Sequence, residues 1–415
     1  MSELSEITAE RIIADASYGT LGYPWREWDI LRAQSPVHPF LDWDIPFHAV
    51  TRHEDITEIG RHPEIWLNGP RLLIADMDES GLDFERPPTL IEMDPPVHAE
   101  HRRLIAKKFT PRNVAKLHPD IERICAKIVD DLLEEGGHTE VDFVERVSAP
   151  VPTAVIAWML GVPESDWKLI FEWTNQQLGS NDPEYAGEED PREVASRSLV
   201  EMFTYFAGLV EERKKNPKDD LISLFCTAEV GGKPLEMIQI LAWCQIIMIA
   251  GNETTRNATS GGLIAMIENP DQLRLFQGDP EKMMRPMLEE ILRFTSPIIH
   301  FARTASCDTE LRGKKIRKGE HLAIFFPSAN RQEDIFDNPY SFQIDRYPNN
   351  HLAFGVGEHF CAGAHIARLE LQMIFKHLLP RIEEIELAAP PSRLHSNLVG
   401  GIKRLPIRYK LRSAA

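Results

Sequence analysis

The stretch of the chain most suited to chemistry is HLAFGVGEHFCAGAH, residues 351–365, which holds a single cysteine, Cys361, among glycines. Gly355, Gly357 and Gly363 allow a tight loop and let peptide N–H groups approach the sulfur without interference from a Cβ atom. Such donors favour the thiolate, which is the form of cysteine that acts as nucleophile and as metal ligand. The pattern therefore predicts a loop that holds a thiolate.

The residues after Cys361 predict an amphipathic helix that ends before Pro380. Ile366, Leu369 and Met373 fall at positions i, i+3 and i+7, the spacing of one buried helix face. A sulfur at the N-terminus of this helix would feel the positive end of the helix dipole. We therefore expect the pKa of this thiol to be lowered.

The number and spacing of the cysteines indicate the redox compartment of the protein and limit the roles open to Cys361. The cysteines are odd in number, widely spaced and never in a CxxC pair: Cys125, Cys226, Cys244, Cys307 and Cys361. This pattern indicates neither a disulfide framework nor a zinc site, and it favours a reducing, cytoplasmic compartment. A buried free cysteine is most often a small hydrophobic residue. If Cys361 does chemistry, two roles stay open, a nucleophile or the axial ligand of a cofactor metal.

Composition narrows the class of protein. The chain has 415 residues, a formal net charge of -18 and an apolar fraction of 43%. This negative charge argues against nucleic acid or an anionic membrane as the main partner. The N-terminus has no signal-peptide core. The most apolar run, residues 238–250, is short and contains two glutamines, which is typical of a buried core helix rather than a membrane span.

A mainly helical fold with a smaller β portion must position these residues. Residues 97–290 are mostly helical in pattern, with stops near Pro111, Pro217 and Pro270. Short β-like runs flank this region, PVHPFL and FHAVTR before it and FARTAS, HLAIFFP and LPIRYKL after it. A Gly/Pro/Asp-rich stretch, residues 68–96, predicts a long loop of the kind that is often functional. Because no linker or repeat divides the chain, we expect one domain over residues 1–415.

The segment FGVGEHFCAG resembles the haem-binding signature of the cytochrome P450 superfamily. This resemblance implies a helical bundle around a buried haem (heme b, iron protoporphyrin IX), with Cys361 as the axial iron ligand and Phe354, Gly355 and Gly363 in the haem-binding loop. A thiolate ligand pushes electron density to iron and favours O–O cleavage. N–H donors from the loop temper that donation.

Four residues match the family's partners for the haem propionates. His98 and Arg102 lie at i and i+4, on one face of a helix that starts after Pro96. Taken alone, they are equally consistent with a solvated basic helix. The resemblance implies that they bind a propionate, together with Arg303 in FARTA and His359 in the cysteine loop. A buried carboxylate needs such partners because leaving it unpaired costs several kcal/mol.

The same helix region carries a basic cluster: Arg103, Lys107, Lys108 and Arg112. Ordinary solvation explains many such clusters. In so acidic a chain, however, the cluster also fits a docking surface for an acidic iron–sulfur ferredoxin, with an attraction that weakens as the salt concentration rises.

A third group is Glu290 and Arg293 in LEEILRF, with Arg346 in FQIDRYP. An i,i+3 ion pair alone contributes little at a protein surface. The resemblance implies a buried Glu290–Arg293–Arg346 network that is structural and fixes the core on the haem side.

A long helix, roughly residues 234–268, changes from apolar to polar at GNETT, residues 251–255. Thr254 could simply bond back to the carbonyl of Ala250, which is common in helices. The apolar pattern resumes at Leu263, however, so the polar patch is an island, and such islands tend to be functional. The resemblance matches Glu253 and Thr254 to the family's acid–alcohol pair, in which Glu253 relays protons from solvent for O–O cleavage and Thr254 holds the reacting oxygen species and a water.

Candidate lining residues of a substrate pocket are mostly large and aliphatic, which suits an apolar cyclic or branched molecule. They are Ile246, Ile249, Ala250, Ile298, Ile299, His300, Leu398 and Val399. His300 could instead bond to the haem edge or to backbone. The loop of residues 66–91 is expected to close over the pocket.

The leading functional hypothesis is a monooxygenase that takes electrons from NAD(P)H through a reductase and a ferredoxin. AGNETTRN resembles actinobacterial sterol side-chain hydroxylases, and NPKDDLISL resembles bacterial terpineol hydroxylase, so the expected substrate is terpenoid or steroid-like. Two alternatives stay open. A peroxide-driven peroxygenase is expected to lack the acid–alcohol pair, and a non-enzymatic haem sensor usually needs an output domain.

Overall fold

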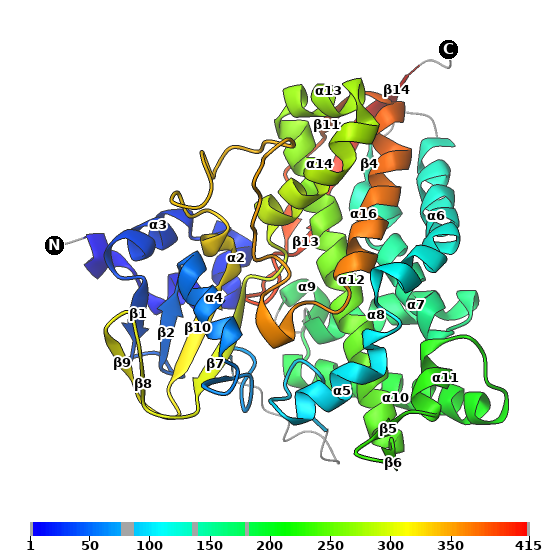
Figure 1. Cartoon of the computed structure of the whole chain (residues 1–415). Helices are drawn as coiled ribbons and strands as arrows, with labels where there is room; N and C mark the ends of the chain where they lie inside the picture. The colour runs from blue at the N-terminus through cyan, green and yellow to red at the C-terminus, as the bar shows by residue number, and fades with distance from the viewer. Residues whose placement is uncertain (1–2, 76–86, 135–139, 179–181, 413–415) are drawn as a thin grey trace.

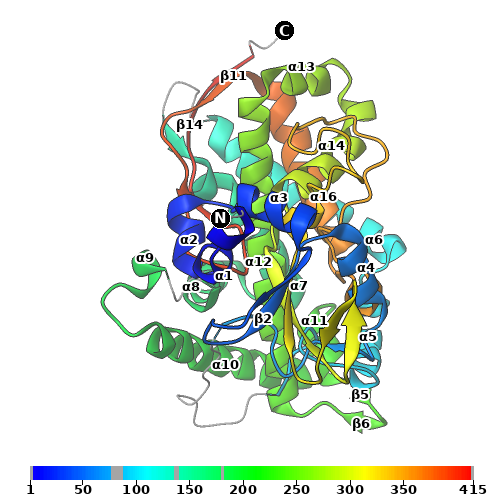
Figure 2. The same cartoon turned by 90° about the vertical axis from the view of Figure 1, so that its left-hand side faces the viewer.

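The structure, a computed structural model, describes residues 3–75, 87–134, 140–178 and 182–412. Figure 1 shows a larger helical part beside a smaller part that contains the main sheet. In Figure 2 the N-terminal helices and this sheet lie in front of the long central helix α12 (Met237–Glu268). This arrangement confirms the expectation of a mainly helical fold with a smaller β portion.

The helices begin and end close to the predicted proline positions. Pro111 begins α6, the helix before Pro217 ends at Lys215, and Pro270 begins α13, as expected because proline fits the first turn of a helix but not its interior. The other helices, in chain order, are α1 (Ala9–Ile13), α2 (Asp15–Leu21), α3 (Trp25–Gln34), α4 (His53–Arg61), α5 (Val97–Ala106), α6 (Pro111–Glu134), α7 (Pro150–Leu160), α8 (Trp167–Leu178), α9 (Pro183–Ala186), α10 (Pro191–Lys215), α11 (Leu221–Cys226), α13 (Pro270–Gly278), α14 (Pro280–Thr295), α15 (Phe326–Ala329) and α16 (Ala364–Leu378).

The main sheet has five strands in the order β1-β2-β10-β7-β3, and a second sheet has the order β11-β14-β4. In the main sheet only the β10–β2 pair is parallel. The strands are β1 (Val37–Phe40), β2 (Phe47–Val50), β3 (Trp66–Leu67), β4 (Val141–Asp142), β5 (Glu229–Val230), β6 (Lys233–Pro234), β7 (His300–Ala305), β8 (Thr309–Leu311), β9 (Lys314–Ile316), β10 (His321–Phe325), β11 (Ile382–Leu387), β12 (Ser392–Arg393), β13 (Ile402–Arg404) and β14 (Pro406–Leu411).

Helix α12 runs through the middle of the helical part and packs against α7, α10, α14 and α16. Its start is fixed by a capping box, in which Glu236 and Gln239 satisfy each other's backbone N–H groups. The helix therefore starts at Met237 and not at Pro234, which lies in the β5–β6 hairpin. None of the described helices is long and apolar enough to cross a lipid bilayer.

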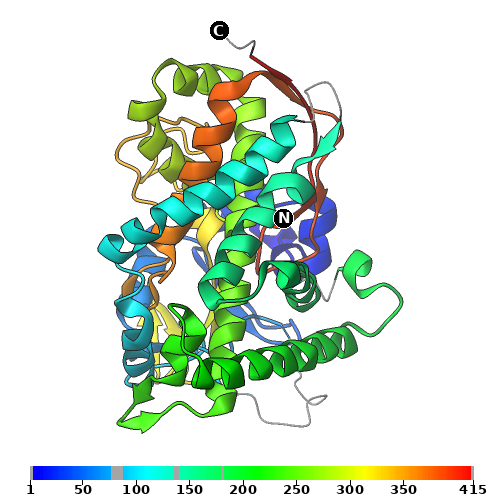
Figure 3. The same cartoon turned by 90° about the vertical axis from the view of Figure 1, so that its right-hand side faces the viewer.

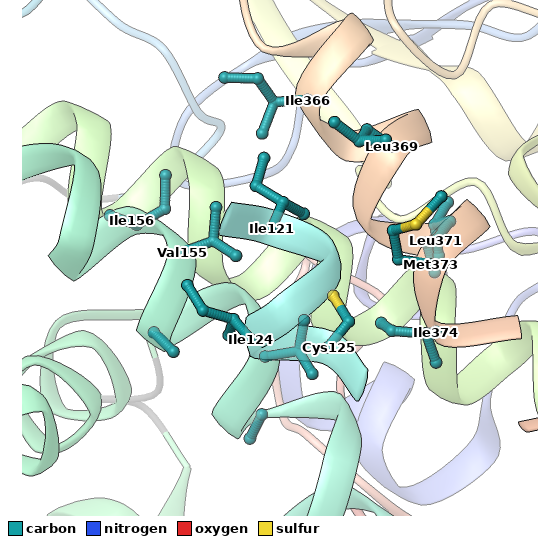
Figure 4. Close-up of a cluster of buried hydrophobic side chains, with 14 of the residues drawn as sticks. Ile121, Ile124, Cys125, Val155, Ile156, Ile366, Leu369, Leu371, Met373 and Ile374 are labelled. Atoms are coloured by element: carbon teal, nitrogen blue, oxygen red, sulfur yellow. The ribbon is translucent and has the colours of Figure 1, made fainter. Parts of the chain in front are cut away.

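Helix α16 packs on α6, as Figure 3 shows from the right-hand side of the view in Figure 1. The cysteine loop lies directly before the N-terminal end of α16. Figure 4 shows the contact in detail: Ile121, Ile124 and Cys125 of α6 face Ile366, Leu369, Met373 and Ile374 of α16. The predicted apolar face of α16 is thus buried. Burial of apolar surface stabilises by about 25 cal/mol per Å², so this contact helps to fix α16 and the loop at its N-terminal end.

All five cysteines are free thiols, in agreement with the sequence analysis. Cys125 illustrates the ordinary structural role: it is buried in the α6–α16 contact, and burial raises the pKa of its thiol well above the usual value. Cys361 lies in a different environment.

Candidate active site

A cavity of about 280 Å³ lies between α12, the cysteine loop of residues 353–363, β7 and the turn that carries Leu398 and Val399. Cys361 lies on one wall, and the polar patch of α12, including Glu253 and Thr254, lies on another. The fold thus brings together two motifs that are separated by about a hundred residues in the chain.

The loop around Cys361 is shaped by the glycines that the sequence singled out. Gly355 and Gly357 have φ angles of +70° and +79°, a conformation that other residues rarely adopt. A Cβ atom on Gly357 would lie 1.7 Å from the carbonyl oxygen of Gly60, so this position also allows close contact with the end of α4. The N–H of Cys361 donates to the carbonyl of Phe354 at 2.9 Å, which closes the loop.

The predicted lowering of the Cys361 pKa is wrong for the protein chain by itself. Burial is the largest effect and raises the pKa, while the backbone N–H groups of Gly363 and Ala364 and the charges of Arg102 and Arg368 lower it by less. Desolvation therefore outweighs the N–H donors and the two arginine charges. A cation bound directly to the sulfur would reverse the balance, because a metal ion deprotonates a coordinating thiol.

The four residues matched to propionate partners do come together. The rings of His98 and His359 lie 4.1 Å apart between centroids. Arg102 donates to the carbonyl of Phe360 at 2.6 Å and Arg303 donates to the carbonyl of Ala302 at 2.7 Å, which leaves both guanidinium groups beside the cavity.

Two acidic side chains act on this cluster: the carboxylate of Glu358 lies 3.6 Å from Nδ1 of His98, and the charge of Asp94 acts on Arg303. Burial, followed by the charges of Arg303, His98 and Arg102, lowers the pKa of His359 to about 3. Burial also lowers the pKa of Arg303 to about 10, against the opposing charge of Asp94. Both ring nitrogens of His98 and Nε2 of His359 are buried without hydrogen-bond partners. Buried polar atoms are rarely left unsatisfied, so this site fits a ligand with carboxylates, such as the two of a haem.

The residues around Cys361 also suit the iron of a haem. Within the described residues, no group of three or more His, Cys, Asp or Glu side chains is arranged to hold a metal ion. Cys361 is therefore a single thiol facing a cavity, with N–H donors at its sulfur. These features suit one axial ligand of an iron that is otherwise held by a macrocycle.

Sequence reasoning missed Asn68 in this cluster. Its side chain is 3% exposed, donates to the carbonyl of Ile91 at 2.6 Å and lies 3.3 Å from Nδ1 of His359. Asp94 holds the backbone of this segment by accepting from the N–H groups of Asn68 and Gly69. In the sequence, only the Gly-Pro and Pro-Pro pairs beside Asn68 and Asp94 indicated this loop. Such pairs do not show which side chains point toward the cavity.

The polar patch of α12 is only partly satisfied by its neighbours, since Nδ2 of Asn252 and Oε2 of Glu253 are buried without hydrogen-bond partners among the described residues. Thr254 donates to the carbonyl of Ala250 at 2.8 Å, the back-bonded arrangement considered from sequence, and it also lines the cavity. Asn252 accepts from Thr153 at 3.1 Å. Asn252 thus joins α12 to α7, while Glu253, Thr254 and Thr255 line the cavity.

Glu253 has a partner that the sequence did not reveal. Its carboxylate is 2% exposed and accepts from Arg256 at 2.6 Å. Arg256, 1% exposed, also donates to Asn175 of α8 at 2.8 Å and to the hydroxyl of Tyr185 of α9 at 3.4 Å. Glu253 is thus buried beside Arg256 and is almost entirely shielded from bulk solvent. The spacing of Glu253 and Arg256, at i and i+3, could have indicated this ion pair. The other partners of Arg256 lie some eighty residues away in the chain and could not be found from local spacing.

The Glu290 network has the predicted geometry. Arg293 donates to both carboxylate oxygens of Glu290, at 2.7 and 2.8 Å, and Nε of Arg346 donates to them at 3.0 and 3.2 Å. Arg293 also donates to the carbonyls of Asn330 and Pro339, which carry the chain toward the cysteine loop. The charged groups are fully buried and mutually satisfied.

Six of the eight predicted pocket residues line the cavity: Ile246, Ile249, Ala250, Ile298, Leu398 and Val399. Ile299 and His300 do not, so their prediction as lining residues is wrong. His300 uses both ring nitrogens on backbone, at 2.6 Å from the oxygen of Asn397 and as acceptor from the N–H of Ile74 at 3.2 Å. Side chains alternate along a strand, so β7 turns Phe301 and Arg303 to the cavity and His300 away from it.

The loop expected to close over the pocket contributes Asn68, Leu72, Leu90 and Ile91 to the cavity wall. Residues 76–86 of that loop lie outside the described residues.

Comparisons with known proteins agree with this geometry. A family model described as Cytochrome P450 matches residues 282–411. The chain is 35% identical over 403 residues to Cytochrome P450-terp of a Pseudomonas species, covering 93% of each protein. It is 35% identical over 370 residues to the steroid C26-monooxygenase of Mycobacterium tuberculosis, covering 88% of this chain and 82% of that protein. Among solved structures it resembles CYP108D1 of Novosphingobium aromaticivorans, with a TM-score of 0.88, 33% identity and 99% of each chain covered. The chain therefore belongs to the cytochrome P450 family, with the P450 fold and a haem ligated by a cysteine thiolate, and it is a monooxygenase.

Proposed function

We propose that this cytochrome P450, as one domain over residues 1–415, hydroxylates an apolar terpenoid or steroid-like molecule with O₂ and electrons from NAD(P)H, delivered through a reductase and a ferredoxin. One observation carries the proposal: the same cavity has the Cys361 thiol on one wall and the carboxyl–hydroxyl pair of Glu253 and Thr254 on α12. The names of two relatives, P450-terp and steroid C26-monooxygenase, support the substrate class.

In this proposal Cys361 binds the haem iron, and His98, Arg102, Arg303 and His359 bind the propionates. Bound haem supplies the activation of O₂, which the thiolate promotes by donating electron density. Gly355 shapes the loop, the N–H of Gly363 hydrogen-bonds the sulfur, and Phe354 packs beside it. The protein's contribution is to hold the group, exclude water and manage protons.

Glu253 and Thr254 have the proton-handling roles. The Thr254 hydroxyl donates its own proton to the Ala250 carbonyl, so its lone pairs are free to accept a hydrogen bond from a water in the cavity. Glu253, one residue earlier, supplies a carboxyl that passes protons to that water. A positioned proton donor of this kind typically contributes about 10²–10⁴-fold to a rate.

Changing Thr254 to alanine is expected to separate NAD(P)H consumption from product formation. The variant should still consume reductant, but product per NAD(P)H should fall by about tenfold or more, with the difference appearing as hydrogen peroxide, because the water is no longer held. Product, peroxide and NAD(P)H are measured in the same assay. Thr259→Ala is the matched control, since Thr259 makes the same 2.8 Å bond to the carbonyl four residues back but does not line the cavity. Full coupling in Thr254→Ala would refute its role.

The substrate class follows from the cavity wall. The wall is mainly apolar, with aliphatic side chains from α12, the segment before β7 and the turn at residues 398–399. An apolar cyclic or branched molecule matches such a surface. We expect terpenoids and steroids to shift the Soret band on titration and small charged molecules to leave it unchanged.

The proposed ferredoxin site is the basic cluster at α5 and α6. Arg103, Lys107 and Arg112 are exposed, while Lys108 is paired with Asp219 at 2.8 Å. The neighbouring Arg102 bonds to Phe360 of the cysteine loop, so the cluster lies on the same side of the molecule as the sulfur. An acidic electron donor requires a docking surface that is positively charged and close to the sulfur.

Reversing the charge at Arg103 and Arg112 together is expected to slow reduction by an acidic ferredoxin by about tenfold or more at low ionic strength, with the difference shrinking as salt is added. The measurement is stopped-flow reduction over a salt series. Arg274→Glu on α13, at the far end of the molecule in Figure 1, is the control and should be silent. Unchanged rates and an unchanged salt dependence in the double variant would contradict docking at this surface.

Turnover experiments test the proposed electron source and substrate class. NAD(P)H with a reductase and a ferredoxin is expected to support steady product formation, and hydrogen peroxide alone much less. Faster turnover with peroxide would favour a peroxygenase, and absence of product under both conditions across a terpenoid and steroid panel would contradict the proposed substrate class.

A further inference from the structure

A charged side chain lies against the cysteine loop and has no part in the roles given above. The guanidinium carbon of Arg368, on α16, lies 4.5 Å from the ring centroid of Phe354. Phe354 lines the haem cavity, and its carbonyl accepts from the N–H of Cys361 at 2.9 Å. A guanidinium over an aromatic face at this distance is a cation–π contact. Arg368 therefore contacts a residue that is itself hydrogen-bonded to Cys361.

The position of Arg368 is fixed by Glu289, the neighbour of Glu290 in the LEEILRF segment. Nε and Nη2 of Arg368 donate to the two oxygens of Glu289 at 2.7 and 2.8 Å, a bidentate pairing. Both side chains are partly buried, at 29% and 24% exposed. A bidentate pair of this kind restricts the guanidinium in orientation as well as in distance.

His351 supports the same carboxylate from the start of the loop. Its Nδ1 accepts from the N–H of Ala353 at 3.2 Å, so its proton is on Nε2, which lies 3.0 Å from Glu289. Partial burial opposes ionisation of Glu289, but the bonds from His351 and Arg368 and the charge of Arg368 together lower its pKa to about 2. Glu289 is therefore ionised and held by residues on both sides of Phe354 in the chain.

We propose that Glu289 is a positioning residue that holds Arg368 over Phe354, where the arginine's charge stabilises the sulfur of Cys361 and sets the reduction potential of the haem. The inference depends on the proposed ligation of iron by Cys361. Reduction adds negative charge to the haem iron and its cysteine ligand. A nearby cation therefore favours the reduced form, and a nearby anion opposes it. Arg368 contacts Phe354, whose carbonyl accepts from the N–H of Cys361, whereas Glu289 contacts the loop at His351, ten residues before the sulfur. The pair therefore presents its positive end to the sulfur.

The test is the reduction potential of the purified holoprotein without a redox partner. Arg368→Gln leaves Glu289 unneutralised and is expected to make reduction less favourable, by about threefold to tenfold in its equilibrium constant. Glu289→Gln leaves Arg368 unneutralised and is expected to shift the constant in the opposite direction. The double variant removes both charges and should lie between the two. Lys376→Gln is the matched control, since it removes a charge from the same helix at an exposed pair with Glu122.

Shifts of opposite sign are what distinguish an electrostatic role from a structural one. If both single variants shifted the potential in the same direction, or neither differed from Lys376→Gln, the proposal would be overturned. Arg368→Lys keeps the charge but not the planar bidentate geometry, so a potential near that of Arg368→Gln would show that the geometry matters. The carbon monoxide spectrum of each variant is recorded in parallel: a spectrum without thiolate character in the unaltered protein would refute the ligation itself, not the role of Glu289.

Discussion

Glutamine at position 253 is expected to lower the rate of product formation by about 10²–10⁴-fold, the usual contribution of a positioned proton donor. The carboxyl of Glu253 lines the cavity and lies within the polar patch of α12, beside Thr254. An amide of the same shape keeps the contact with Arg256 but cannot pass a proton. Substrate binding, measured by the Soret shift, should change little, because the wall around the substrate remains apolar.

The measurement is kcat in H₂O and D₂O under NAD(P)H-driven turnover. Glu253→Gln is expected to show a larger solvent isotope effect than the unaltered protein, because proton delivery then limits the rate. Glu253→Asp keeps the acid with a shorter side chain and should recover part of the activity. An unchanged kcat and isotope effect in Glu253→Gln would show that protons reach the cavity by another path.

Removing the guanidinium of Arg293 is expected to prevent haem loading and to cost about 3–5 kcal/mol of stability, the usual effect of breaking a buried ion pair. Arg293→Ala leaves the carboxylate of Glu290 with Arg346 as its remaining cation, and it leaves the carbonyls of Asn330 and Pro339 without their donor. These carbonyls belong to the segment that leads to the cysteine loop. The loop should therefore lose its fixed position.

Haem content per protein, from the ratio of Soret to protein absorbance, and chemical denaturation measure this effect. Arg285→Ala provides the control, because Arg285 is an exposed arginine of the same helix, α14. Full haem content and unchanged stability in Arg293→Ala would contradict a structural role for the network.

The elements that the sequence predicted correctly are those governed by local rules. Prolines at 111 and 270 begin helices, and the apolar spacing of Ile366, Leu369 and Met373 forms a buried face of α16. Positive φ angles at Gly355 and Gly357 likewise follow from residue type. These signals lie within a few residues of one another, so they can be found without knowing the fold.

The features that the sequence did not predict depend on tertiary contacts. Asn68 joins the cationic cluster only because the loop after β3 folds back to His359. Arg256 of α12 donates to Asn175 of α8, and Arg368 of α16 donates to Glu289 of α14, which lies 79 residues earlier in the chain. His300 was misplaced because alternation along a strand fixes which residues share a face but not which face is inward. The Cys361 pKa was misjudged because a local dipole argument omits the cost of burial.

The central claim is the bond between the Cys361 thiolate and a haem iron, and one spectrum tests it directly. The purified holoprotein is reduced, exposed to carbon monoxide and compared with Cys361→Ser. We expect the unaltered protein to give the red-displaced Soret band that marks sulfur-ligated haem and the serine variant to lack it. A purified protein that binds no porphyrin, or one whose carbon monoxide complex absorbs like a histidine-ligated haem, would contradict the account.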